Sequence, residues 1–155
     1  MDTQATAPFF VAASSVFSQM FGIEPVAAAP RNVDGSENHE WEISAILGVA
    51  GGAQGVVALR FTHASVDAML KASGVETNGE QDRLATASGM VAELVNIISG
   101  NAIGEYPALN LDISPPVVVK GKNHQLTWPK IAPVVATEFS SDLGKFELAV
   151  CFNGK

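Results

Sequence analysis

Residues 82–105, DRLATASGMVAELVNIISGNAIGE, have the clearest structural pattern in the chain. An α-helix advances about 100° per residue, and this winding places apolar side chains along one side of the segment. Proline cannot lie inside a helix because it has no N–H to donate. Since Pro107 limits the segment, we expect a helix from about Glu80 to about Glu105. Its predicted core face comprises Leu84, Ala87, Val91, Leu94, Val95, Ile98 and Ala102.

The opposite face of this helix combines small residues with two strongly polar side chains. Six residues, here called the polar strip, lie within an arc of about 80°: Thr86, Gly89, Glu93, Asn96, Gly100 and Gly104. A glycine inside a helix costs about 1 kcal/mol relative to alanine, so helix stability does not favour this composition. Glu93 and Asn96, three positions apart, present a carboxylate and a carboxamide side by side. The strip is either a solvated helix face or a surface for close approach of another molecule.

Toward the N-terminus, the pattern predicts two further helices and a hairpin. Residues 8–21 predict an amphipathic helix that ends at Gly22, and residues 24–38 predict a loop. Residues 41–49 and 55–61 predict two strands joined by a glycine turn, followed by a short helix capped by Thr62. The apolar residues of the first helix recur at helical spacing: Phe10, Ala13, Phe17, Met20 and Phe21.

Beyond residue 110 the pattern changes to strands. Extended segments are expected around 113–119 and at 125–128, 132–139 and 145–152. Prolines beside them place these strands near sheet edges or bulges. With no repeat and no long linker, we predict one domain over residues 1–155. Its expected fold class is α/β, a layered domain with a largely antiparallel mixed sheet and three main helices.

Composition excludes several classes of function. Nine Lys and Arg against sixteen Asp and Glu give a formal net charge of −7, and no cluster of cations offers a surface for nucleic acid or anionic lipid. No apolar run reaches the roughly 18 residues of a membrane span. The lone Cys151 fits a reducing compartment, and the first cation, Arg31, comes too late for a signal peptide. We expect a cytoplasmic protein that binds neither nucleic acid nor membrane.

Patterns for built-in catalysis or metal binding are absent from the sequence. His39, His63 and His124 are isolated, and none has a second ligand at metal spacing. The sequence contains no Walker A loop and no G-x-S-x-G elbow. The sequence therefore shows no group of nucleophile, base or metal ligands that would support a small-molecule enzyme. No metal site is expected.

The segment ELVNIISGNA (93–102) resembles the signature of the CheC/CheX/FliY phosphatases of bacterial chemotaxis, whose active helix carries E-x-x-N followed by a Gly-Asn pair. NLDISPPVVVKG (110–121), LTWPKIAPVV (126–135) and LGKFELAVCF (143–152) resemble the C-terminal half of CheX-type chains. A single E-x-x-N favours the CheX-like branch, because CheC-like chains resemble a duplicated arrangement with two motifs. Ala92 departs from the family, which often has glycine before the glutamate.

This resemblance implies a protein aspartyl-phosphate phosphatase that acts on a phosphorylated CheY-type response regulator. It implies that Asn96 orients the attacking water and that Glu93 pairs with a lysine of the regulator. Gly89 and Gly100 would leave room for the regulator's loops, with Thr86 at the rim. No cofactor of its own is implied, because the receiver domain supplies the Mg²⁺.

The resemblance also implies a homodimer formed through sheet edges. The alternative function is a non-catalytic receiver-binding adaptor, or a flagellar-switch-like module of the same fold. An adaptor would bind the receiver without shortening the lifetime of its phosphate.

Overall fold

The computed structural model describes residues 5–33, 40–122 and 124–154. The helices are α1 (Ala7–Phe21), α2 (His63–Ala72), α3 (Gly79–Ile103) and the short 3-10 helix η1 (Pro107–Leu109). The strands are β1 (Val26–Ala27), β2 (Arg31–Asn32), β3 (Ile43–Ala50), β4 (Gly55–Phe61), β5 (Asp112–Ile113), β6 (Val117–Lys120), β7 (Val134–Ser141) and β8 (Gly144–Phe152).

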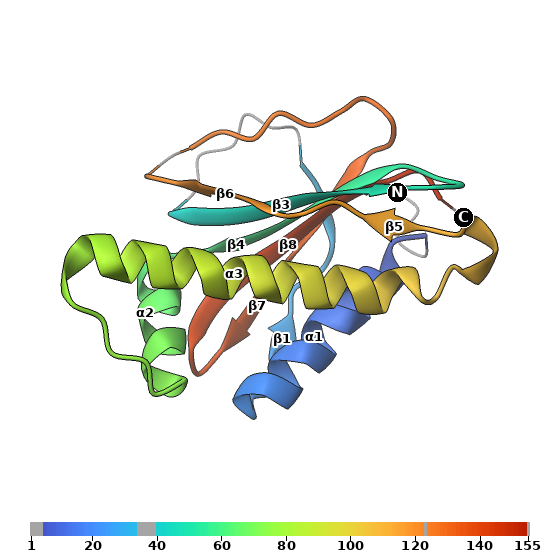
Figure 1. Ribbon diagram of the computed structural model, residues 1–155. Helices are drawn as coiled ribbons and strands as arrows, with labels where there is room; N and C mark the ends of the chain where they lie inside the picture. The colour runs from blue at the N-terminus through green and yellow to red at the C-terminus, as the bar shows by residue number, and fades with distance from the viewer. Residues whose placement is uncertain (1–4, 34–39, 123, 155) are drawn as a thin grey trace.

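The strands form one eight-stranded sheet in the order β1-β7-β8-β4-β3-β5, with β2 also beside β7 and β6 also beside β3. All of these pairings are antiparallel. Figure 1 shows α1, α2 and α3 on one side of the sheet, with α3 crossing the strands. The layered α/β class is therefore confirmed, with an antiparallel sheet.

The main core lies between the helices and the sheet. Phe17 of α1 stacks on Phe146 of β8 with ring centroids 4.0 Å apart, and Phe139 of β7 stacks on the same ring at 4.9 Å. Buried aliphatic residues of α3 and the sheet continue this core. Because α3 packs on β3, β4, β5 and β6 and also on α1, its position is fixed from two sides.

The other face of the sheet carries a buried polar row. Glu147 of β8 is 1% exposed and accepts a hydrogen bond of 2.7 Å from Arg31. Arg60 of β4 lies beside the same carboxylate and donates to the Ser44 hydroxyl at 3.0 Å. The ring of His124, from the segment after β6, lies 2.6 Å from that hydroxyl. The chain between β6 and β7 thus contacts this outer face.

Several local predictions are confirmed. The three helices lie within one or two residues of their predicted bounds, and β3 and β4 form the expected hairpin. Thr62 caps α2 through a capping box, in which the Thr62 and Ser65 side chains satisfy each other's backbone N–H groups. β6, which follows two prolines, pairs only with β3 among the described strands.

Other predictions were wrong. Residues 125–128 form no strand, and the predicted loop at 24–38 contains the two-residue strands β1 and β2. The buried face of α1 is also rotated from the predicted one, since Phe10 and Phe21 are only half-buried and Met20 is 51% exposed. The residues that α1 buries are Phe9, Ala12, Ala13, Val16 and Phe17. His39 lies outside the described residues.

Candidate functional site

The helix α3 presents the polar strip on the side away from the sheet. Its predicted core face is confirmed apart from Leu84, which is half-buried, and Arg83 and Ser99 are buried as well. Of the strip residues, Thr86 and Asn96 are half-buried, and the remainder are exposed: Gly89, Glu93, Gly100 and Gly104. The fold therefore brings all six predicted strip residues to one accessible helix surface.

Glu93 and Asn96 are not engaged within the chain. Neither side chain has a hydrogen bond or an ion pair to any other part of the chain that the structure describes. Asn96 is half-buried, whereas Glu93 is exposed. Together they offer one anionic acceptor and one neutral group that both donates and accepts hydrogen bonds.

Open space surrounds the glycines that flank this pair. Gly89 lies four residues before Glu93, and Gly100 lies four residues after Asn96. A Cβ atom built at either glycine meets no heavy atom within 4 Å, so neither glycine is required by packing inside the chain. Ala92 is half-buried at the edge of the strip. The glycines leave the backbone of α3 bare on both sides of the polar pair, where another molecule can approach closely.

Arg83 holds the first turns of α3 to α2. Its side chain is 11% exposed, and its Nε lies 2.5 Å from a carboxylate oxygen of Asp67. One Nη atom lies 3.1 Å from Glu80 and 3.4 Å from Glu42. Burial lowers the pKa of Arg83, but the hydrogen bond and the charge of Asp67, with the other two carboxylates, outweigh burial and leave that pKa raised. Sequence reasoning missed this anchor because Asp67 and Glu42 are distant from Arg83 in sequence.

Tyr106 holds the C-terminal end of α3 to the start of α1. Its hydroxyl donates to the Ala5 carbonyl, and its ring packs edge-on against Phe152 with centroids 5.1 Å apart. Phe9 of α1 also packs against both rings. Burial, and secondly the charge of Glu105, raise the pKa of Tyr106 to about 12. The phenol therefore stays a neutral donor throughout the physiological range.

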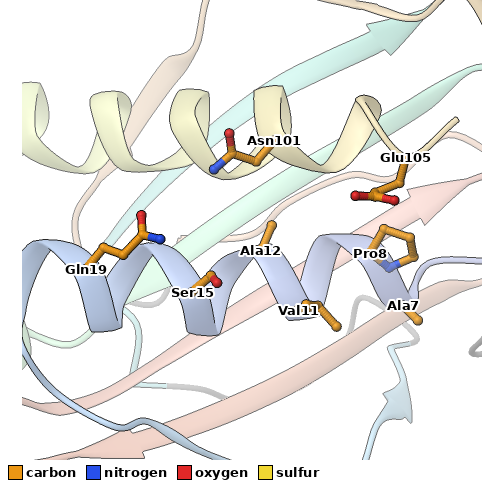
Figure 2. Close-up of a pocket in the computed structure, with 8 residues that line it drawn as sticks. All are labelled: Ala7, Pro8, Val11, Ala12, Ser15, Gln19, Asn101 and Glu105. Atoms are coloured by element: carbon orange, nitrogen blue, oxygen red, sulfur yellow. The ribbon is translucent and has the colours of Figure 1, made fainter. Parts of the chain in front are cut away.

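A groove of about 470 Å³ lies between α1 and the C-terminal end of α3. Figure 2 shows Gln19 of α1 and Asn101 of α3 extending toward the gap between the two helices, with Glu105 at the end nearest Pro8. The lining does not include Glu93 or Asn96. Sequence reasoning did not place these residues in a site, although Asn101 belongs to the Gly-Asn pair that follows the E-x-x-N motif.

The described histidines lie in hydrogen-bonded networks. His63 Nδ1 lies 2.9 Å from Glu42, and its Nε2 lies 3.1 Å from Asp67. Within residues 5–33, 40–122 and 124–154, no group of three or more His, Cys, Asp or Glu side chains could hold a metal ion. In the same residues, no helix is both long and apolar enough to cross a membrane.

Solved structures with the same fold cover nearly the whole chain. The crystal structure of a chemotaxis protein CheX from Desulfovibrio desulfuricans has 27% sequence identity and a TM-score of 0.81, and the match covers 97% of this chain and 99% of that one. Chemotaxis protein CheX from Vibrio vulnificus matches at 24% identity with a TM-score of 0.81, over 97% and 99% of the two chains. The CheX-CheY-BeF3-Mg²⁺ complex from Borrelia burgdorferi matches at 23% identity with a TM-score of 0.79, over 96% and 97%.

Sequence comparison identifies the family. None of the curated proteins matches this chain. The family model for the chemotaxis phosphatase CheX matches residues 43–140, well over half of the 155 residues. This matched region runs from β3 almost to the end of β7, and it contains the whole of α3 with the polar strip. The chain therefore belongs to the CheX family of chemotaxis phosphatases.

Proposed function

We propose that this protein accelerates hydrolysis of the aspartyl phosphate on a CheY-type response regulator, with Asn96 and Glu93 as its working side chains. One observation carries the proposal. The carboxylate and the carboxamide of α3 lie side by side, unused within the described chain, between two glycines that have open space above them. Membership of the CheX family and the fold shared with a CheX protein in complex with CheY support the choice of partner.

Asn96 would hold the attacking water. Phosphoryl transfer depends mainly on positioning and charge stabilisation, so a helper protein needs only to order a water in line with the phosphorus atom. A carboxamide suits this role because its oxygen accepts a hydrogen bond from water while its NH₂ donates to a phosphoryl oxygen. A carboxylate in the same place would repel the phosphoryl group. The half-buried position of Asn96 limits the number of orientations that its side chain can take.

Glu93 would fix the register of docking. An exposed carboxylate on α3 can reach a lysine at the phosphorylation site of the receiver and form a charge-assisted hydrogen bond. This contact becomes stronger when the partner excludes water from it. The bare backbone at Gly89 and Gly100 would let the loops of the receiver approach the helix closely, with Thr86 at the rim. The Mg²⁺ at the phosphorylation site would come with the receiver.

The test is the decay of a phosphorylated CheY-type regulator in the presence of Mg²⁺, alone and with catalytic amounts of the protein. Wild-type protein is expected to shorten the lifetime of the phosphate. Asn96→Ala is expected to lose most of this effect, on the order of 10²–10³ in rate, while it still binds the regulator. Full activity of Asn96→Ala would refute its role. Binding by the wild type without faster decay would instead identify an adaptor.

We also propose that the protein is a cytoplasmic homodimer joined through sheet edges. Val117, at the start of the edge strand β6, is 64% exposed, and edge strands offer unpaired N–H and C=O groups to a second chain. Light scattering of the purified protein tests this proposal directly. A mass equal to one chain at micromolar concentration would exclude the dimer.

A further inference from the structure

The groove between α1 and α3 is a preformed feature of the molecule. Both helices bury one face in the common core, and contacts of Phe9, Tyr106 and Phe152 hold their adjoining ends together. The α3 side of the groove is formed by Asn101 and Glu105, next in sequence to Gly100 and Gly104 at the C-terminal end of the polar strip, and Val11 on its α1 side is 67% exposed. A partner that covers the strip therefore meets the rim of this groove without any rearrangement of the fold.

The groove has one charged group among its lining residues, the carboxylate of Glu105 at one end, and few charges surround it. Residues 7–21 of α1 contain no ionisable side chain, and between Leu84 and Gly104 of α3 the only one is Glu93. The chain as a whole is 16% charged, and a solvated helix face ordinarily carries Lys and Glu, which are good helix formers. Depletion of charge is instead the compositional mark of the central part of a protein interface.

The opposite end of α3 differs. A second hollow, at the start of the helix, is lined by the charged or titratable side chains of Glu42, His63, Glu80, Lys120 and Lys122. Charge is thus concentrated at the N-terminal end of α3 and avoided along the part that carries the polar pair and borders α1. On the α1 side, a partner that docks on Glu93 and Asn96 finds a surface whose one charged group is Glu105, at the end of the groove.

The polar strip is too small to hold a protein partner by itself. A standard interface takes about 20–30 residues from each side, whereas the strip has six residues, three of them glycines. A receiver that reaches Asn96 must therefore cover a neighbouring element. The polar groups in the groove are available for this contact, because Ser15, Gln19 and Asn101 have no side-chain hydrogen bond to the described residues.

Resting on the proposed function, we infer that the α1–α3 groove is a second contact surface for the same phosphorylated receiver domain. The strip engages the phosphorylation site, and the groove takes an adjoining uncharged segment of the receiver. An apolar side chain of that segment packs against Val11, while Gln19 and Asn101 hydrogen-bond its polar groups. This surface, remote from the reacting atoms, contributes to the choice among receivers.

The test compares two variants with a matched control. Val11→Glu and the isosteric Gln19→Glu each place a charge in the groove, and Val75→Glu places the same charge at a position 38% exposed in the loop after α2, outside the sheet. For dephosphorylation of the CheY-type regulator, we expect KM to rise about tenfold in each groove variant, with kcat within a factor of two of the wild type. The control is expected to keep the wild-type KM. Thermal unfolding of all three variants confirms that the fold is retained.

Each outcome has a distinct meaning. If the wild type accelerates decay and both groove variants keep its KM, the groove has no role in docking, although the proposed function stands. If both variants bind the receiver normally but change the mass measured by light scattering, the groove contacts a second copy of this chain, and the inference is refuted. If the wild type neither binds the BeF₃⁻-activated receiver nor accelerates decay, the proposed function fails first, and the inference fails with it.

Discussion

Replacing Gly89 and Gly100 by alanine should make the protein more stable and a poorer phosphatase. Both residues lie in the interior of α3, where alanine is favoured over glycine by about 1 kcal/mol. A Cβ at either position meets no atom within 4 Å, so the folded chain offers no steric penalty. The free energy of unfolding of the double variant should be about 2 kcal/mol higher than that of the wild type. For a chain of 155 residues this corresponds to a rise in Tm of roughly 6 °C.

The same two methyl groups should weaken docking. If the receiver packs closely on the bare helix, each added methyl costs about 1–3 kcal/mol of overpacking. This is about a fivefold to more than a hundredfold rise in KM or Kd per site. Thermal unfolding followed by circular dichroism gives the stability change. The decay of the phosphorylated regulator at several concentrations gives KM.

A control separates the two effects. Ala64 is exposed in the first turn of α2, away from the polar strip, and Ala64→Gly makes the reverse exchange there. It should lower the free energy of unfolding by at most about 1 kcal/mol, the cost of this exchange inside a helix, and leave KM unchanged. A double glycine variant that is stabilised but keeps the wild-type KM would show that the receiver does not approach these glycines. A loss of stability would refute the inference that the space above them is open.

Three further predictions concern the framework around the site. Tyr106 is the only tyrosine, so ultraviolet titration should show its ionisation near pH 12 in the folded protein and near pH 10 in the unfolded one. The unfolded chain therefore releases this proton at a lower pH than the folded chain does. As a result, the free energy of unfolding, measured relative to Tyr106→Phe, should fall as pH rises from 10 toward 12. Glu147→Ala should lower the free energy of unfolding, measured by denaturant titration, by about 3 kcal/mol or more, because Arg60 is buried beside the removed carboxylate. A loss below about 1 kcal/mol would contradict this reasoning. Thr62→Ala should lower the free energy of unfolding by about 1 kcal/mol, because α2 loses its cap. The rate of dephosphorylation should not change, since α2 only supports the site.

Local sequence patterns predicted the helices and the central hairpin correctly. The extent of α3 followed from regular apolar spacing before Pro107, and the cap of α2 followed from Thr62, because both depend on residues only a few positions apart. β1 and β2 were missed, since two-residue strands show no alternation and form only because β7 lies beside them. Residues 125–128 have strand-forming residues but form no strand, and neighbouring His124 contacts the outer face of the sheet.

The buried face of α1 could not be predicted from its sequence. Apolar residues surround most of this helix, with Phe9 and Phe10 adjacent in the chain, so the apolar pattern gives no single direction. Packing against α3 and β8 selected Phe9 over Phe10. The same packing left Val11 exposed beside the groove.

The order of side chains along α3 is a property of the amino-acid sequence alone, and helical geometry then requires Glu93, Asn96 and the glycines to share one face. The sequence also identifies the family, since the matched region contains this helix. The open space at this face, the anchoring of the two ends of α3 by Arg83 and Tyr106, and the groove formed with α1 all depend on the packing of the folded chain. Spacing within one helix is a local property, whereas open space, anchoring and grooves depend on which distant segments pack nearby.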